Sequence, residues 1–103
     1  HPAWVQAVTM QATRLQHSSN LYYTAPCGKL AKRLCARTGL DQVFFGNSGA
    51  EANEGAIKCA RKYSVTTYGP DRNKVLTLVN SFHGRTLATL TATGQDGFWP
   101  LPC

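Results

Sequence analysis

The chain has 103 residues, with 11 Lys and Arg against 5 Asp and Glu, and a formal net charge of +6 when His is neutral. This length matches one ordinary domain with a modest core and excludes a multidomain machine. With 43% hydrophobic and 16% charged residues, the chain is not a disordered tail. Its apolar runs are too short for a membrane span, and we do not expect a signal peptide at its start, because no basic segment is followed there by an apolar stretch.

The first stretch of the chain predicts a helix that begins at Pro2, because proline suits a first helical position. Apolar residues then recur at steps of three and four, which places them on one face: Val5, Val8, Ala12 and Leu15. Residues 18–20 (Ser-Ser-Asn) interrupt this pattern.

A second helix is predicted from about Pro26 to Thr38, and Gly39 stands where a left-handed helix cap forms. We expect Leu30 and Leu34 to face inward. The opposite face carries four cations that we expect to face water: Lys29, Lys32, Arg33 and Arg37.

Residues 43–45 (Val-Phe-Phe) predict a short buried parallel strand. Ser48 followed by Glu51 is a capping box, which predicts a third helix over residues 49–63. Its inward stripe, on either side of Gly55, consists of small side chains that allow a close approach to a neighbouring backbone: Ala52, Ala56, Cys59 and Ala60.

The second half of the chain continues with a turn at residues 68–71 (Tyr-Gly-Pro-Asp) and the strongest predicted strand, residues 75–79 (Val-Leu-Thr-Leu-Val). In residues 87–93 threonines alternate with apolar residues. This pattern fits either a strand or a helix that begins near Gly84. Residues 97–103 predict irregular structure. Strands that alternate with helices indicate an α/β fold with a mostly parallel sheet and flanking helices.

The charge and the cysteines leave two alternatives to weigh. A positive chain can bind nucleic acid, but these cations are scattered and form no known nucleic-acid motif, so a solvated helix surface is favoured. The chain has four cysteines: Cys27, Cys35, Cys59 and Cys103. Because no two of them form a Cys-x-x-Cys pair, a zinc site is disfavoured, and we expect small buried thiols instead.

Two loops follow the predicted strands, where open parallel sheets bind ligands. In the first, the N–H groups of Ser48, Gly49 and Ala50 open a helix and would bind a phosphate. The alternative is that Ser48 only caps the helix. The loop has neither the P-loop lysine nor the three glycines of a dinucleotide fingerprint.

The second loop, residues 82–86, brings three functional side chains into four positions. Arg85 has the two-pronged geometry that pairs with a carboxylate, Phe82 would cover a flat ring, and His83 could do acid–base work. Each also has an ordinary structural alternative, as a core ring, a surface cation or a loop residue.

Taken together, the motifs match a known enzyme family. Residues 44–54 (Phe-Phe-Gly-Asn-Ser-Gly-Ala-Glu-Ala-Asn-Glu) and 56–63 (Ala-Ile-Lys-Cys-Ala-Arg-Lys-Tyr) precede residues 80–86 (Asn-Ser-Phe-His-Gly-Arg-Thr) and 92–95 (Ala-Thr-Gly-Gln). With residues 15–23 (Leu-Gln-His-Ser-Ser-Asn-Leu-Tyr-Tyr), the chain resembles the class III pyridoxal-phosphate aminotransferases over nearly its whole length. The resemblance implies part of the large domain of a fold-type I transferase.

For the cofactor, pyridoxal 5'-phosphate, the resemblance implies contacts in both loops. Ser48, Gly49 and Ala50 would hold its phosphate, although many relatives have Thr in place of Ala50. Phe82 would stack on the pyridine ring. His83 would be a neighbour of the cofactor with no assigned role.

For the substrate, the resemblance implies that Arg85 binds the α-carboxylate of an amino acid and that Tyr23 lies at the substrate pocket. It also implies that residues 84–93 are helical. The arginine after Phe-His-Gly points to the acetylornithine aminotransferase subgroup, with ornithine-type relatives next. These move an amino group between N-acetylornithine and 2-oxoglutarate in arginine biosynthesis, as cytoplasmic homodimers without nucleic acid or membrane partners.

The resemblance also implies what residues 1–103 do not contain. The chain has five lysines: Lys29, Lys32, Lys58, Lys62 and Lys74. None of them matches the Schiff-base lysine of the family, so we expect no catalytic residue in this stretch. The chain begins with His1 rather than Met, and we expect it to be an early part of a longer enzyme, inactive by itself. Two alternatives remain, a non-catalytic phosphate-binding or interaction module and another class III ω-aminotransferase.

Overall fold

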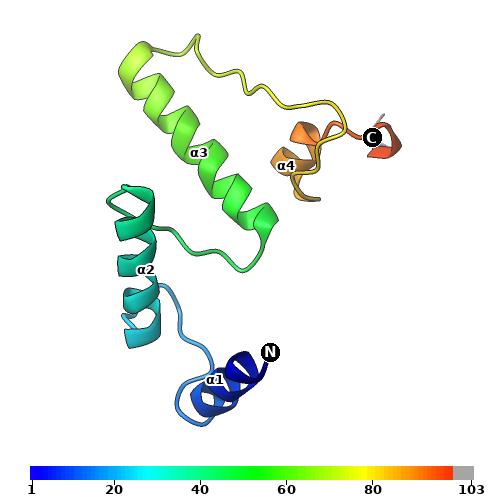
Figure 1. Cartoon of the computed structure of the whole chain (residues 1–103). Helices are drawn as coiled ribbons and strands as arrows, with labels where there is room; N and C mark the ends of the chain where they lie inside the picture. The colour runs from blue at the N-terminus through cyan, green and yellow to red at the C-terminus, as the bar shows by residue number, and fades with distance from the viewer. Residues whose placement is uncertain (99–103) are drawn as a thin grey trace. The chain divides into compact units, whose positions relative to one another are not determined.

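The computed structural model describes residues 1–98 and divides the chain into two compact units, His1–Val43 and Phe44–Cys103. The first unit contains α1 (Pro2–Ala12) and α2 (Ala25–Thr38). The second contains α3 (Gly49–Tyr68), α4 (Leu87–Ala92) and a short 3-10 turn, Asp96–Phe98 (Figure 1). Within residues 1–98, no helix is long and apolar enough to cross a membrane.

Both predicted helices of the first unit are present, although α1 ends at Ala12, so Leu15 of its predicted apolar face lies beyond the helix. His1 caps α1, since its Nδ1 accepts from the N–H of Ala3 at 3.3 Å. Gly39 ends α2 in the left-handed region, with φ +73°, which costs a glycine little.

The apolar faces predicted for these two helices do not form a core. Val5, Val8, Leu15 and Leu30 are all exposed, and Leu34 is half-buried. A unit of some forty residues has too little apolar surface to bury such faces by itself.

The third helix begins as predicted but runs five residues further than Tyr63. Ser48 Oγ accepts from the N–H of Glu51 at 3.2 Å, which is one half of the predicted capping box. The extension contains β-branched residues with weak helix propensity. Contacts made by Tyr68 compensate, because its ring meets Tyr63 edge-on and Arg72 lies over it at 4.8 Å.

The inward face of α3 differs from the one predicted. The small residues of the predicted stripe, Ala52, Ala56, Cys59 and Ala60, are exposed. The half-buried face instead carries Ala50, Asn53, Glu54 and Ile57, at steps of three and one that follow a helix face. Two of these, Asn53 and Glu54, form hydrogen bonds with a distant segment of the same unit. These hydrogen bonds stabilise this face more than burial of the small alanine side chains would stabilise the predicted one.

The close approach predicted at Gly55 is present, although the neighbour is a side chain rather than a backbone. A Cβ at Gly55 would lie 3.1 Å from Cε1 of Phe44. The ring of Phe44 therefore fits against α3 where no side chain stands in its way.

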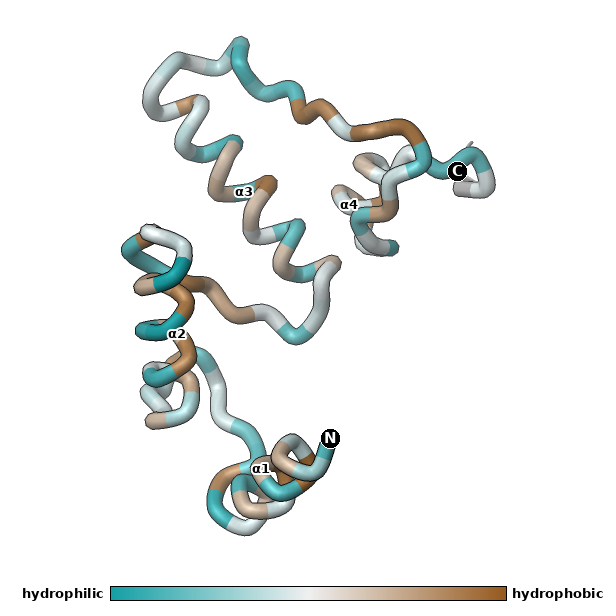
Figure 2. The backbone as a smooth tube through the Cα atoms, in the orientation of Figure 1, coloured by the Kyte–Doolittle hydropathy of each residue, from teal (hydrophilic) through white to brown (hydrophobic). Residues whose placement is uncertain are grey.

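Neither predicted strand forms within residues 1–98. Residues 43–45 and 75–79 are irregular, because a strand needs a neighbouring strand to accept and donate its backbone hydrogen bonds. The second run is the brown stretch between α3 and α4 in Figure 2, and Leu76 on it is 95% exposed.

The segment whose pattern left helix and strand open is a helix. The family resemblance implied a helix over residues 84–93, and the helix that forms, α4, is shorter and spans Leu87–Ala92. Of the residues predicted to be irregular, 97 and 98 belong to the 3-10 turn Asp96–Phe98, and residues 99–103 lie outside the described residues.

The described part of the chain buries no hydrophobic side chain. Its fully buried side chains are polar, Thr89 and Thr93, and the backbone of Gly84 lies beside them. The prediction of buried thiols is also wrong for the three described cysteines, which form no disulfide. Cys27 and Cys59 are exposed, and Cys35 is half-buried. Cys103 lies outside the described residues.

Candidate functional site

The loop at residues 82–86 lies against the first turn of α3, and Gly84 makes this approach possible. Gly84 has φ +134°, and a Cβ there would lie 2.6 Å from both Ala50 Cβ and Thr89 Oγ1. No other residue fits this space or adopts this backbone conformation without strain. The two predicted functional loops therefore meet at a contact that only glycine allows.

Two polar side chains of α3 hold this loop. Asn53 Nδ2 donates to the carbonyl of His83 at 2.8 Å. Glu54 Oε1 accepts from Thr86 Oγ1 at 2.6 Å and from the N–H of Ala88 at 3.2 Å. The carboxylate of Glu54 thereby caps the first turn of α4, where helix geometry leaves N–H groups without partners.

The hydrogen bond from the Thr86 hydroxyl is the main cause that lowers the pKa of Glu54 below its ordinary 4.5. The Ala88 N–H and the charge of Lys58 act in the same direction, while desolvation opposes them. Glu54 is therefore ionised at neutral pH and holds the loop as an anion.

Buried threonines of α4 and its C-terminal end hold the same loop from the other side. The N–H of His83 donates to Thr93 Oγ1 at 3.1 Å, and the N–H of Thr86 donates to Thr89 Oγ1 at 3.1 Å. Thr93 Oγ1 also lies 2.9 Å from the Thr89 carbonyl, to which it donates. Both backbone groups of His83 thus have partners, which fixes the direction of the loop.

A hollow of about 380 Å³ opens where the loop and α3 meet. It is lined by Gly49, Ala50, Asn53, Phe82, His83, Gly84 and Arg85. Five of the seven residues singled out from the sequence thus line one hollow, and Ser48 directly precedes two of them on the chain. Tyr23 belongs to the first unit, so its place at this site stays a prediction.

The side chains at this hollow have complementary chemistry. The guanidinium of Arg85 lies 5.7 Å from the centre of the Phe82 ring, and that ring is 51% exposed. Gly49 and Ala50 begin α3, and a Cβ at Gly49 would meet nothing within 4 Å. The hollow therefore offers an open helix N-terminus for an anion, an aromatic face and a cation for a carboxylate.

His83 adds an unsatisfied polar atom. Its Nε2 is buried and has no hydrogen-bond partner within residues 1–98. A buried ring nitrogen without a partner costs free energy, because the water it lost is not replaced.

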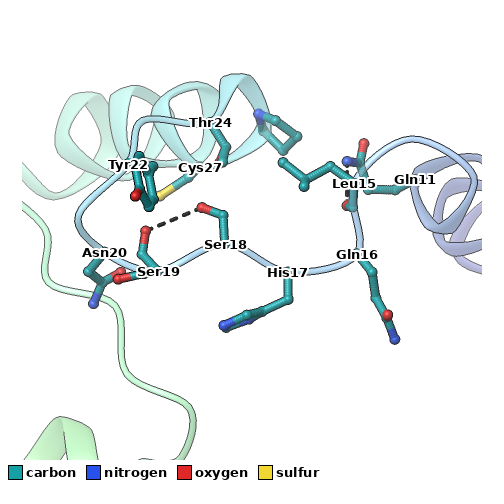
Figure 3. A pocket seen from close by; sticks show the side chains of 11 residues that line it. Gln11, Leu15, Gln16, His17, Ser18, Ser19, Asn20, Tyr22, Thr24 and Cys27 are labelled. Carbon is teal, nitrogen blue, oxygen red and sulfur yellow. Dashed lines mark hydrogen bonds between the residues drawn. The ribbon is translucent and has the colours of Figure 1, made fainter.

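A second hollow, of about 270 Å³, lies in the first unit around the segment between α1 and α2 (Figure 3). Polar side chains line much of it, among them Gln11, His17, Ser18 and Asn20. Within this wall, Ser18 Oγ donates to the carbonyl of Ser19 at 3.2 Å. No group of three metal-ligating side chains occurs here or elsewhere in residues 1–98.

The sequence reasoning missed the residues that join the two loops. Asn53 and Glu54 lie three and four residues after Ala50, so they share its helix face with the predicted phosphate-binding turn. Polar residues at this spacing after the predicted phosphate-binding turn were the available signal. Thr89 and Thr93 gave a similar one, since they lie four residues apart on one face of a predicted helix.

Comparison with known proteins identifies relatives over the whole described chain. A sequence model of the class-III aminotransferases matches residues 1–99. Acetylornithine aminotransferase from Haemophilus ducreyi is 60% identical over 94% of this chain, and the enzyme of that name from Methanocaldococcus jannaschii is 56% identical over 99% of it. A solved aminotransferase from Bacillus anthracis is 34% identical over 98% of this chain, with a TM-score of 0.85.

These relatives are much longer than the chain. The alignments cover 25% and 27% of the two acetylornithine aminotransferases and 23% of the solved structure. The chain therefore spans about a quarter of the proteins that it matches.

Proposed function

Because the chain belongs to the class-III aminotransferase family, we propose that it forms part of a pyridoxal-phosphate-dependent acetylornithine aminotransferase. The activity is the transfer of an amino group between N-acetylornithine and 2-oxoglutarate, in arginine biosynthesis. The meeting of the α3 N-terminus with the loop of Phe82 and Arg85 at one hollow carries this proposal. The 46–60% identity to acetylornithine aminotransferases favours this subgroup over other ω-aminotransferases.

The residues at the hollow fit pyridoxal phosphate. The N-terminus of α3 suits its phosphate, with the N–H groups of Gly49 and Ala50 and the hydroxyl of Ser48 as donors. Ser48 Oγ donates only a long hydrogen bond, of 3.4 Å, to Glu51 Oε2, and a phosphate oxygen would replace that acceptor. The exposed face of Phe82 suits the flat pyridine ring, and a ligand in the hollow would give the buried Nε2 of His83 a neighbour.

When bound, the cofactor supplies an electron sink for the chemistry at the amino-bearing carbon. The protein's own part is to bind and to orient. Arg85 pairs with the substrate carboxylate through two parallel hydrogen bonds, which fixes the substrate's direction. The guanidinium of Arg85 lies over the ring of Phe82. This contact restricts the movement of the guanidinium and so maintains the distance between the site for the pyridine ring and the site for the carboxylate.

The fold of the complete protein belongs to the same proposal. We expect residues 43–45 and 75–79 to become strands of a mostly parallel sheet when further strands pair with them. Residues 1–103 would then be an N-terminal part of the cofactor-binding large domain. A cytoplasmic homodimer, with Tyr23 at the substrate pocket, is the state that we expect.

The test is an assay of the full-length protein that contains this chain, supplied with pyridoxal phosphate, N-acetylornithine and 2-oxoglutarate. We expect glutamate to form, and to form more slowly when another ω-amino donor, such as 4-aminobutyrate, replaces N-acetylornithine. Cofactor binding without glutamate from any donor would contradict an aminotransferase and favour a non-catalytic module. Preference for the other donor would contradict the acetylornithine assignment.

A further inference from the structure

Glu54 joins two elements that are far apart in the sequence. It lies 32 residues from Thr86 and 34 from Ala88, yet one of its oxygens accepts hydrogen bonds from both. These bonds cross from α3 to the start of α4, two helices that Figure 1 shows in the same unit. They hold the second loop against α3, whose first turn forms the other wall of the hollow.

Arg85 lies between two residues whose positions are fixed. Gly84 before it contacts Ala50, and Thr86 after it donates to Glu54. The guanidinium itself contacts the ring of Phe82, and no carboxylate within residues 1–98 pairs with it. The contacts of its two neighbours therefore set the point on the backbone from which the Arg85 side chain extends toward the Phe82 ring.

We propose that Glu54 is a positioning residue for Arg85. By tying Thr86 and Ala88 to α3, it sets the backbone from which Arg85 reaches the substrate carboxylate. This inference rests on the proposed function for the identity of that substrate. Glu54 does not line the hollow, so its effect on Arg85 passes through the loop.

The chemistry of the tie favours a carboxylate at this position. The N–H of Ala88 belongs to the first turn of α4, where the helix carries partial positive charge. A carboxylate oxygen accepts two hydrogen bonds there as an anion, and such bonds are stronger than neutral ones. An amide retains the oxygen acceptor without the charge, and alanine retains neither.

The experiment compares E54A and E54Q with the wild-type full-length protein. For E54A we expect the KM values of both N-acetylornithine and 2-oxoglutarate to rise about tenfold, with kcat within about twofold, because the lost contact orients a binding group. The KM values of E54Q should lie between those of the wild type and those of E54A. D71N is the matched control, since it removes one carboxylate from an exposed turn, and it should behave as wild type.

A second readout does not depend on catalysis. Amide hydrogen exchange measures opening of residues 82–88, and E54A should accelerate exchange there while the middle of α3 stays protected. A wild-type protein without turnover would contradict the proposed function alone, and exchange would still test the tie. Unchanged exchange in E54A would overturn the proposal. So would KM values that stay at wild-type level, or a loss of kcat and stability with no selective rise in KM.

Discussion

At Gly84 the absence of a side chain brings the two loops of the site together. The positive φ and the 2.6 Å separations that a Cβ would have from Ala50 and Thr89 set two independent requirements for glycine. The contact explains why the second loop can lie directly on the first turn of α3.

Replacing Gly84 with alanine should therefore destabilise the full-length protein by about 3 kcal/mol, the sum of backbone strain and overpacking. Thermal denaturation of G84A measures this effect. G28A is the control, because Gly28 lies within α2 and a Cβ there would meet nothing within 4 Å. Alanine at this helical position should stabilise by about 0.5–1 kcal/mol. Equal melting temperatures for wild type and G84A would contradict the close contact.

At this scale the sequence singled out residues that line the hollow better than the residues that support it. Ser48, Phe82 and Arg85 stood out because each side chain has a recognisable use at the end of a predicted strand. Asn53 and Thr93 did not, because their roles depend on partners 30 and 10 residues away. Spacing along the chain indicates that each of them shares a helix face with its neighbours, but it does not indicate which distant group it contacts.

Among the elements, α2 and α3 illustrate where local signals suffice. The capping serine of α3 and the glycine that ends α2 are local, and both predicted boundaries hold. The buried face of α3 is not local, since hydrogen bonds to a distant loop decide it. The predicted strands likewise depend on neighbours, which residues 1–98 do not supply.

The tie between α3 and α4 should depend on pH. The pKa of Glu54 is lowered in the folded protein, chiefly by the Thr86 hydroxyl. Its ionised form therefore adds stability above the ordinary pKa of 4.5, and this contribution is lost as the pH falls through the lower folded-state value.

Hydrogen exchange of α4 in wild type and E54Q measures this dependence. At neutral pH the wild type should be the better protected of the two. The difference should shrink at pH values well below 4.5, as Glu54 becomes neutral like glutamine. A difference that stays constant across this range would contradict a charged tie.

For the whole molecule, the main feature is apolar surface without a cover. Leu76, Leu78 and Val79 are each at least 80% exposed, and the described part of the chain buries no hydrophobic side chain. Large exposed apolar patches and unpaired strand-like backbone favour association. The coverage of about a quarter of each relative is in keeping with partners for these faces in the rest of such a protein.

The isolated chain of residues 1–103 should therefore self-associate. Light scattering coupled to size-exclusion chromatography should show a mean mass that rises with concentration. The isolated chain should also lack transaminase activity, since we expect none of its lysines to be the family's cofactor-binding lysine. A clean monomer at all concentrations would contradict the first expectation, and measurable turnover the second.

We propose above that the loop of Phe82 and Arg85 and the first turn of α3 form one site for a cofactor and a carboxylate substrate. The most direct test is steady-state kinetics of the R85Q variant of the full-length protein, with the dissociation constant for pyridoxal phosphate measured alongside. We expect kcat/KM for N-acetylornithine to fall about 100-fold, as for a lost charged hydrogen-bond pair, with cofactor affinity close to wild type. Wild-type kcat/KM in R85Q would contradict the account.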